Sequence, residues 1–528
     1  MTPAWDHIVV GAGSAGCVLA ARLSEDPDRR VLLIEAGGAD RSPLIHIPGF
    51  LANVVFSRSL NWAYQGDPDA SLDGRRLTWM AGRVLGGSSS INGMVYGRGL
   101  PEDYRRWVAA GAPGWDWEDM LPWFRKSESW TGEPNPARGA DGPLAVRVFE
   151  DTHPACRSVM QAFVAAGLPH VADYSAGVCE GVGLTQATQQ GGWRASAARA
   201  YLGPARRRGN LRILTRARAL SLVFEADRCV GIRYARGGIE SEARAEREVV
   251  LAAGAIGTPK LLLLSGVGPA EALRAADVPV RHDHPGVGQG LNDHVNVKLS
   301  ATVRTRTYNS DRVGLRKALH GVRFLADRGG PAASPANHVQ GFLKSQPDLA
   351  SADYQVQVMA LGFNDDPADR TDGVSVVVSP CHPKARGQVS LRSADPRDPP
   401  RIEMTMLESD DDVGVLLRGC RHARDMLERG PVRDFDGRVF LPTLASDTDA
   451  EWKAFFRRTA GLNWHPTSTC RMGEDLDAVV DTDLRVRGLS GLSIADASVM
   501  PCVTSGNTNA PVIAIAERAA AMIAARTA

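Results

Sequence analysis

Residues 5–38 read WDHIVVGAGSAGCVLAARLSEDPDRRVLLIEAGG, and this stretch decides the fold. His7–Val10 is a short apolar run followed by glycine, which predicts a buried parallel strand. A helical pattern continues to Leu23, and after a polar turn a second apolar run, Val31–Ile34, predicts another strand. Strand, helix and strand in this order predict a βαβ unit and an α/β fold.

The turn between the first strand and the helix carries the pattern GAGSAG, residues 11–16. Gly11 allows a tight turn, Gly13 lets a pyrophosphate approach the backbone, and Gly16 lets helix and strand pack closely. The helix N-terminus then faces the phosphates, and Glu35 ends the second strand, where a carboxylate can accept hydrogen bonds from ribose hydroxyls. This combination predicts a dinucleotide-binding site. The alternative is a glycine-rich turn in an unrelated α/β domain.

The composition limits the classes of function. A chain of 528 residues implies more than one domain, and a net charge of +1 gives no reason to expect nucleic acid as a partner. The eight cysteines form no CxxC pair and no disulfide or zinc-knuckle spacing, so we expect a reducing compartment. The apolar runs are too short to span a bilayer. We therefore expect no transmembrane anchor and a cytoplasmic protein, or one peripheral to the inner membrane, while the oligomeric state stays open.

FAD and NAD are the two candidate dinucleotides. A nicotinamide enzyme would place its substrate machinery soon after the βαβ unit. Here the other cofactor-like segments are dispersed to residues 82–99, 252–268 and 491–510. A long ligand such as FAD needs distant chain segments to hold its adenine, ribitol and flavin, so the dispersal favours FAD.

Five further motifs carry a family resemblance. GRVLGGSSSINGMVYGRG (residues 82–99) and GAIGTPKLLLLSGVGP (residues 254–269) resemble the two signature stretches of the glucose–methanol–choline (GMC) oxidoreductase family. GVGQGLNDH, NWHPTSTCRMG and GLSIADASVMPCVTSGNTNAP resemble the later motifs of that family, in the expected order. Within the family the chain looks most similar to bacterial alcohol dehydrogenase and choline dehydrogenase-like members.

The resemblance implies a two-domain fold. Residues 1–150, 196–297 and 466–528 would form a discontinuous, Rossmann-like FAD-binding domain, and residues 151–195 and 298–465 a mixed-sheet substrate-binding domain, α+β overall. Some members attach FAD covalently through a histidine where this chain has Ile91, so a non-covalent FAD is expected. The residues implied in cofactor binding are Gly11, Gly13, Ser14, Ala15, Gly16, Glu35, Ala36, Trp62, Val84, Gly87, Asn92, Met94, Val95, Ala219, Trp464, Asp496, Ala497, Thr508 and Asn509.

By the same resemblance His465 and Asn507 face the flavin across the substrate. Oxidation of an alcohol removes the hydroxyl proton while a hydride leaves the carbon. An imidazole suits the base at neutral pH, and an amide can hydrogen-bond the alcohol oxygen without competing for the proton. Two alternatives use the same histidine. Cys470 would be a nucleophile if its thiol pKa were lowered, and a metal would need third and fourth ligands that no cluster in the sequence offers, so no metal is expected.

The substrate and the electron acceptor follow from single positions. His338 aligns where choline-type relatives carry Glu, which disfavours a cation and implies a neutral primary alcohol bound near Trp464 and His338. Asn463 stands where oxidases of the family commonly carry a small apolar residue, which favours a dehydrogenase with a quinone-like acceptor. The alternatives are an oxygen-using alcohol oxidase of the aryl or furfuryl alcohol type, an FAD-containing hydroxynitrile lyase, and an NAD-dependent or non-catalytic nucleotide-binding protein.

Overall fold

The computed structural model describes residues 5–178, 180–311, 314–363 and 369–526 and begins with the expected βαβ unit. β1 (Trp5–Val10) and β2 (Val31–Ile34) are parallel, and α1 (Ser14–Leu23) connects them. They belong to a seven-stranded sheet in the order β11-β2-β1-β14-β13-β12, with β26 beside β14. The other strands of this sheet are β11 (Leu211–Leu214), β12 (Ala217–Glu225), β13 (Arg228–Arg236), β14 (Ile239–Leu251) and β26 (Leu492–Ile494).

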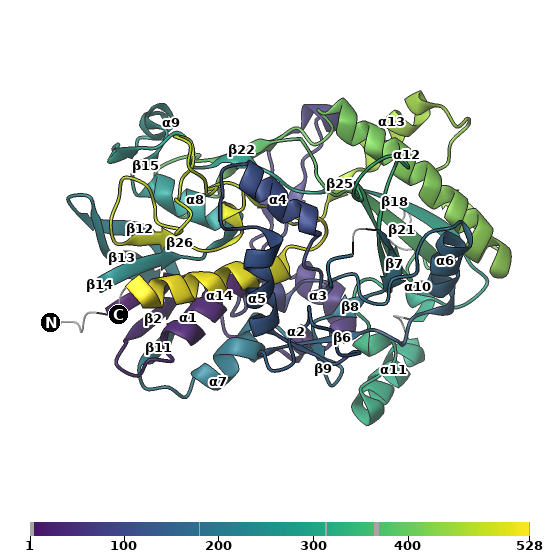
Figure 1. Cartoon of the computed structure of the whole chain (residues 1–528), viewed down its shortest axis with the longest axis horizontal. Helices are drawn as coiled ribbons and strands as arrows, with labels where there is room; N and C mark the ends of the chain where they lie inside the picture. The colour runs from purple at the N-terminus through teal and green to yellow at the C-terminus, as the bar shows by residue number, and fades with distance from the viewer. Residues whose placement is uncertain (1–4, 179, 312–313, 364–368, 527–528) are drawn as a thin grey trace.

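A second seven-stranded sheet lies beside the first (Figure 1). Its order is β24-β18-β21-β20-β19-β7, with β25 beside β18, and every described pair in it is antiparallel. The strands are β7 (Gly181–Leu184), β18 (Val295–Thr302), β19 (Val339–Leu343), β20 (Tyr354–Met359), β21 (Gly373–Pro380), β24 (Arg438–Leu441) and β25 (Gly461–Leu462). Each large sheet packs against its own buried apolar cluster. The division into two domains at the residues given above stays a prediction.

The helices cover these sheets and connect them. α1 packs against α14, and α5 packs on α14 from the other side, while α12 covers β21, β20 and β18 (Figure 1). The helices are α1, α2 (Pro43–His46), α3 (Leu51–Val55), α4 (Pro101–Ala109), α5 (Trp117–Ser127), α6 (Pro154–Ala165), α7 (Gly203–Ala205), α8 (Gly254–Leu264), α9 (Ala270–Ala275), α10 (Tyr308–Asp311), α11 (Gly314–Asp327), α12 (Asp410–Leu427), α13 (Asp449–Thr459) and α14 (Asn509–Arg526). In the described part of the chain, none of them is both long and apolar enough to cross a bilayer.

Small sheets of two or three strands lie around the two large ones. They are β3 (Tyr64–Gln65) with β4 (Thr78–Trp79), β9 (Gln189–Gln190) with β10 (Trp193–Arg194), β15 (Val267–Gly268) with β16 (His282–Asp283), β5 (Glu128–Trp130) with β6 (Leu144–Val148) and β8 (Gln186–Ala187), and β17 (Gln289–Leu291) with β22 (Gly387–Ser390) and β23 (Arg401–Met404).

α11 presents an apolar face to solvent. It projects from the body of the protein beneath the second sheet (Figure 1). Phe324 is buried and packs against Trp193, whereas Leu315, Leu319 and Val322, on the opposite side of a 3.6-residue helix, are 55–77% exposed. An amphipathic helix normally turns its apolar face to the core, whereas the apolar face of α11 points to solvent.

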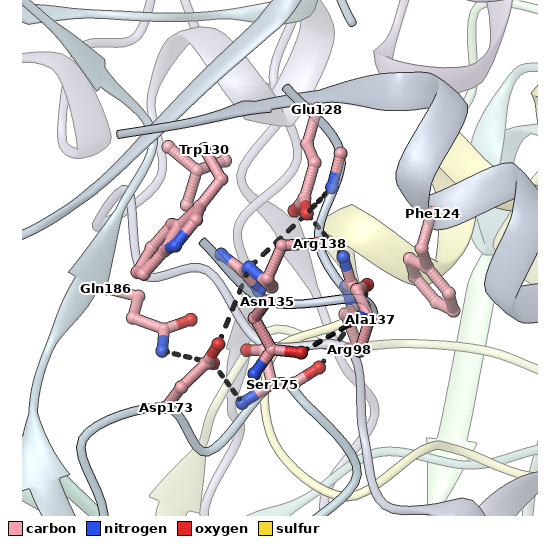
Figure 2. A network of polar contacts seen from close by, with 12 residues as sticks. Arg98, Phe124, Glu128, Trp130, Asn135, Ala137, Arg138, Asp173, Ser175 and Gln186 are labelled. Carbon is pink, nitrogen blue, oxygen red and sulfur yellow. Dashed lines mark hydrogen bonds and ion pairs between the residues drawn. The ribbon is translucent and has the colours of Figure 1, made fainter. Parts of the chain in front are cut away.

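A buried ion network anchors the end of the second glycine-rich motif, residues 82–99 (Figure 2). Arg98 and Glu128 are fully buried and form an ion pair, and Arg138 lies 3.3 Å from Glu128 and 3.7 Å from Asp173. The Arg138 guanidinium also stacks 3.9 Å from the centre of the Trp130 ring. Two cations and two anions thus balance one another where water is excluded, and each partner depends on the others.

Candidate active site

A single cavity of about 820 Å³ extends from the glycine turn of the first sheet to the strands of the second. Both predicted catalytic residues, His465 and Asn507, line it. The predicted cofactor residues that line it are Gly11, Gly13, Ser14, Ala15, Glu35, Ala36, Trp62, Gly87, Asn92, Met94, Val95, Ala219, Trp464, Asp496, Ala497, Thr508 and Asn509. The fold therefore gathers segments that are hundreds of residues apart around one space.

Three predicted residues lie outside this cavity. Gly16 packs instead against Gly11: a Cβ on Gly16 would come within 1.8 Å of the Gly11 carbonyl oxygen, which agrees with its expected role in helix–strand packing. Val84 is fully buried in a small apolar cluster with Ile91. His338 requires a correction, because its ring lies behind the cavity wall and cannot reach a substrate there.

The contacts of His338 explain this correction. Its Nδ1 accepts a hydrogen bond from the backbone N–H of His153 at 3.0 Å, and its Nε2 lies 3.0 Å from Ser334 Oγ. The ring packs edge-on against Phe149, with 5.2 Å between ring centres. Ala336 and Asn337, just before it in the chain, line the cavity in its place. His338 therefore gives no reason to disfavour a cationic substrate.

The glycine turn fits a dinucleotide. Gly11 has φ +98°, and a Cβ there would lie 2.5 Å from the Ala252 carbonyl oxygen. A Cβ on Gly87 would lie 2.6 Å from Gly13 Cα, so the second glycine-rich motif lies directly on the first. The N-cap of α1 has no side-chain hydrogen bond, and Gly13, Ser14 and Ala15 all line the cavity. Free N–H groups at a helix N-terminus bind phosphate, so this end of the cavity has the chemistry that a pyrophosphate needs.

Glu35 lies beside this turn. Its two carboxylate oxygens accept hydrogen bonds from the N–H groups of Ala12 at 2.9 Å and Gly37 at 2.7 Å. Burial raises the pKa of Glu35 to about 7, and these two N–H donors oppose the rise. Each oxygen keeps a lone pair for a further donor, which is what a ribose hydroxyl would offer.

Arg194 holds the second glycine-rich motif in shape. It is fully buried, and among the described residues no carboxylate pairs with it. Its Nη1 donates to the backbone oxygen of Asn92 at 2.7 Å and to Asn92 Oδ1 at 2.8 Å, and its Nε donates to the Ile45 oxygen. Burial lowers the pKa of Arg194 to about 9. No pattern in the sequence marked this arginine, because its partners are carbonyl groups brought together only by the fold.

The predicted catalytic pair is in contact. His465 Nε2 lies 3.1 Å from Asn507 Nδ2, and the His465 backbone N–H donates to Asp293 Oδ1 at 2.8 Å. On its other side His465 Nδ1 lies 3.0 Å from Nδ1 of His294, a residue that sequence reasoning missed although GLNDH was among the motifs. His294 Nε2 in turn lies 3.2 Å from the carbonyl oxygen of Cys381.

These contacts assign the proton positions. A carbonyl oxygen only accepts, so His294 must carry its proton on Nε2. Burial lowers the pKa of His294 to about 4, so the ring is neutral near pH 7 and its Nδ1 is an acceptor. His465 Nδ1 is then the donor of the 3.0 Å bond, and His465 Nε2 is unprotonated and accepts a hydrogen bond from Asn507 Nδ2 at 3.1 Å. Burial, and then His294, lower the pKa of His465 well below its usual range, so Nε2 stays unprotonated at neutral pH.

The backbone around His465 is unusual. Trp464 has φ +60°, a left-handed conformation that a bulky residue adopts only when its surroundings impose it. Its indole Nε1 donates to the Thr78 oxygen at 2.9 Å, and Pro466 follows His465 and keeps it out of the helical region. Strain therefore accumulates at the residue before the base.

Two competing roles for His465 can now be compared with the structure. Cys470 is fully buried, and burial raises its thiol pKa well above the usual range, which is the opposite of an activated nucleophile. The expectation that no third metal ligand exists is wrong: ligand atoms of Asp293, His294 and His465 lie within 4.8 Å of one another. The hydrogen bonds above already account for both Nδ1 atoms and for Asp293 Oδ1. That the protein holds no metal stays a prediction.

A cavity that joins a phosphate-binding turn to a neutral, unprotonated imidazole nitrogen is typical of a dinucleotide-dependent oxidoreductase. The N- and C-terminal domains of the GMC oxidoreductase family match residues 5–296 and 383–516. The chain is 40% identical to mitochondrial choline dehydrogenase of Mus musculus, over 98% of this chain and 89% of that protein. It is 39% identical to alcohol dehydrogenase (acceptor) of Pseudomonas putida, over 98% and 95%. Pyridoxine 4-oxidase from Mesorbium loti has a similar structure, with a TM-score of 0.90 at 32% identity over 98% of each chain.

The chain therefore belongs to the GMC oxidoreductase family. This confirms the predicted family, the α/β fold class and the prediction of an oxidoreductase of the flavoprotein type. The individual roles given to the lining residues stay predictions.

Proposed function

We propose that the protein oxidises a primary alcohol to the aldehyde, with His465 as the base and Asn507 positioning the alcohol. The observation that carries this proposal is the unprotonated Nε2 of His465 beside Asn507 Nδ2, in residues that line the same cavity as the glycine turn. The residues present fit FAD. When bound, FAD supplies the acceptor for the hydride that leaves the alcohol carbon.

The side chains divide the remaining work. Asn507 Nδ2 donates to His465 Nε2 at 3.1 Å. An alcohol that enters between the two takes over both groups: its hydroxyl proton goes to His465 Nε2, and its oxygen accepts the hydrogen bond from Asn507 Nδ2. The Nδ1–H of His465 already points at His294 Nδ1, so the positive charge formed on the ring is stabilised by a bond that needs no reorganisation. α14 begins at Asn509, and Thr508 and Asn509 line the cavity. The positive end of this helix favours negative charge that develops nearby.

The cofactor is held without a covalent bond in this proposal. Ile91 lines the cavity and is buried, and its hydrocarbon side chain has no nucleophilic atom. The cofactor is then retained by the glycine turn, Glu35 and the motif that Arg194 anchors.

Anaerobic mixing with a panel of primary alcohols tests the proposal. The flavin absorbance at its visible maximum should be bleached by at least one alcohol. His465→Ala should slow this step by orders of magnitude while FAD stays bound. Near-normal reduction by His465→Ala contradicts the role of the base. A bound flavin that no alcohol reduces would instead support the lyase alternative, and a colourless protein would contradict the flavin itself.

We also infer that the electrons pass to a quinone-like acceptor and that the protein binds peripherally to a membrane. Asn463, which bears on the acceptor, is polar: its Nδ2 donates to Ser379 Oγ at 2.9 Å and its Oδ1 accepts from Asn296 at 2.8 Å.

The inferred membrane binding rests on α11. The exposed apolar face of α11 and Lys317 on the same helix suit an anionic bilayer surface. Flotation with anionic vesicles should carry the protein, and Leu319→Glu should abolish this. Equal flotation of both would refute membrane binding through α11.

An oxygen-using oxidase is the second candidate, because pyridoxine 4-oxidase shares this fold over 98% of both chains. Admission of oxygen to the alcohol-reduced protein separates the two. Reoxidation that is slow in air and fast with a soluble quinone supports the dehydrogenase. Rapid formation of hydrogen peroxide supports the oxidase.

A further inference from the structure

β18 and the residue just before it place His294, which supports the base, and Lys298 on the same face. Side chains alternate along a strand, so Asn296 and Lys298 follow the side of His294, which precedes the strand by one residue. Asn296 and Lys298 both line the cavity. Four residues of strand span about 13 Å, so the backbone of Lys298 lies about 13 Å from that of His294, which supports the base. Met359, Leu361 and Val377 form an apolar wall in this part of the cavity.

Lys298 has no anionic partner among the described residues. Its ammonium group lies over the ring of Phe363, with Nζ 5.1 Å from the ring centre. By contrast, Lys260, also at the cavity, donates to the Pro396 oxygen at 2.8 Å, and Arg218 stacks on the Trp62 ring. Asn296 Oδ1 is buried and accepts no hydrogen bond within the described part of the chain. Unpaired charges and acceptors in a partly desolvated site are costly, and they are retained where a ligand completes them.

The carboxylates of the cavity lie elsewhere. Of the described lining residues only Glu35 and Asp496 are acidic. Glu35 accepts from the glycine turn, and Asp496 accepts from the Gly254 N–H at 2.8 Å and from Thr258 Oγ1. Both therefore belong to the first sheet and its connections. The part of the cavity beyond His465 has a positive charge and no described negative one.

We propose that the alcohol substrate carries a carboxylate several carbons from its hydroxyl group, and that Lys298 Nζ binds this carboxylate. This rests on the proposed function, since it names the substrate class of the same site. Hydrogen bonds between ammonium and carboxylate are short and about twice as strong as neutral ones, and the apolar wall suits the carbon chain between the two groups. Burial lowers the pKa of Lys298, and an anion at Nζ would offset this desolvation.

The same geometry separates this chain from relatives whose name includes choline. A cationic head group in this part of the cavity would lie beside Lys298 with no described carboxylate to oppose it. Like charges in a partly desolvated site repel, so a cationic alcohol is the poorest substrate of a matched series.

Three alcohols of one chain length test this: 6-hydroxyhexanoate, 1-hexanol and 6-amino-1-hexanol. The measurement is kcat/KM with a soluble quinone, in the flavin-loaded wild type and in Lys298→Met, which removes the charge and shortens the side chain by one atom. In the wild type 6-hydroxyhexanoate should exceed 1-hexanol by at least tenfold, and 6-amino-1-hexanol should be the weakest. In Lys298→Met the ratio of 6-hydroxyhexanoate to 1-hexanol should fall at least tenfold, or about 1.4 kcal/mol. The control Lys260→Met should keep the wild-type ratio.

The outcomes separate the two proposals. If 1-hexanol reduces the flavin but the wild type does not prefer 6-hydroxyhexanoate, the substrate class is wrong and the proposed alcohol oxidation stands. If Lys298→Met and Lys260→Met change the ratio equally, Lys298 is not the carboxylate site. If no member of the series reduces the flavin while other alcohols do, the carboxylate proposal fails as well. Retained flavin absorbance in each variant shows that it is folded.

Discussion

His294 should determine which nitrogen of His465 acts as the base. In the wild type His294 Nδ1 accepts a hydrogen bond from His465 Nδ1–H at 3.0 Å, which leaves His465 Nε2 unprotonated. His294→Leu removes this acceptor. The buried N–H of His465 then either stays unpaired or moves its proton to Nε2, where the ring can no longer take a proton from an alcohol. An unpaired buried donor costs about 1 to 3 kcal/mol.

This cost sets the expected magnitude. Since 1.4 kcal/mol is a factor of ten, flavin reduction by a saturating alcohol should slow by about 5- to 150-fold in His294→Leu. KM should change little, because His294 does not touch the substrate. His294→Asn offers an amide oxygen as an acceptor and should recover part of the rate. The matched control is His422→Leu. His422 lies on α12, away from the cavity, and its Nδ1 is hydrogen-bonded to Tyr354 OH at 2.6 Å. The flavin of this variant should be reduced at the wild-type rate.

The assay is anaerobic stopped-flow absorbance across a pH series. Only the unprotonated base is active, and the pKa of His465 is lowered well below its usual range. The wild-type rate should therefore be level between about pH 8 and pH 6 and should fall only at lower pH. A base with the ordinary histidine pKa of about 6.5 would already lose rate above pH 6. Wild-type rates in His294→Leu with flavin bound would refute the reasoning. So would an equal loss in the Leu and Asn variants.

Three further predictions concern stability and the cofactor. Burial lowers the pKa of His7 and His294 to about 4 and that of His338 to about 3. The unfolded chain takes up protons near pH 6.5, so each of these histidines lowers the stability by about 2 kcal/mol between pH 7 and pH 5. Burial raises the pKa of Glu35 to about 7 and that of Asp293 to about 8, and these carboxyl groups act in the opposite direction over the same range. In urea unfolding the change between pH 7 and pH 5 should therefore differ by about 2 kcal/mol between the wild type and His338→Gln, and an equal change in both would contradict this. Glu128→Gln should lower the free energy of unfolding by about 3 to 5 kcal/mol, whereas Glu102→Gln, which breaks an exposed pair with Arg105, should lower it by less than about 1. Acid precipitation should release FAD into the supernatant, and yellow colour retained in the washed pellet would rule out a non-covalent cofactor.

The local parts of the fold and site were predictable because local chemistry determines them. A strand followed by glycines at 11, 13 and 16 can form only a tight turn with a close helix, and the structure has both. His465 and Asn507 stand in motifs whose context identified them, and they lie in contact. Residues that act through pairing between distant strands were not predictable. His294 approaches His465 because β25 runs antiparallel to β18, with Leu462 opposite Val295.

His338 shows the opposite failure. Its position was inferred from an alignment in a part of the chain without motifs, and a shift of one residue along a strand turns a side chain to the other face. Asn337 lines the cavity, whereas the next residue, His338, is buried behind it. A substrate residue in such a segment can be located only once the register is known, and the register depends on partners that the sequence does not show.

The register of β18 also explains how base and substrate binding can vary independently. His294 supports His465 from one end, and Lys298 lies about 13 Å of backbone further along the same face. Two sites on a paired strand at this separation are fixed relative to each other, yet they share no direct contact, so their substitutions should add. Replacing Lys298 would alter the charge that the substrate must carry while His465 keeps its tautomer.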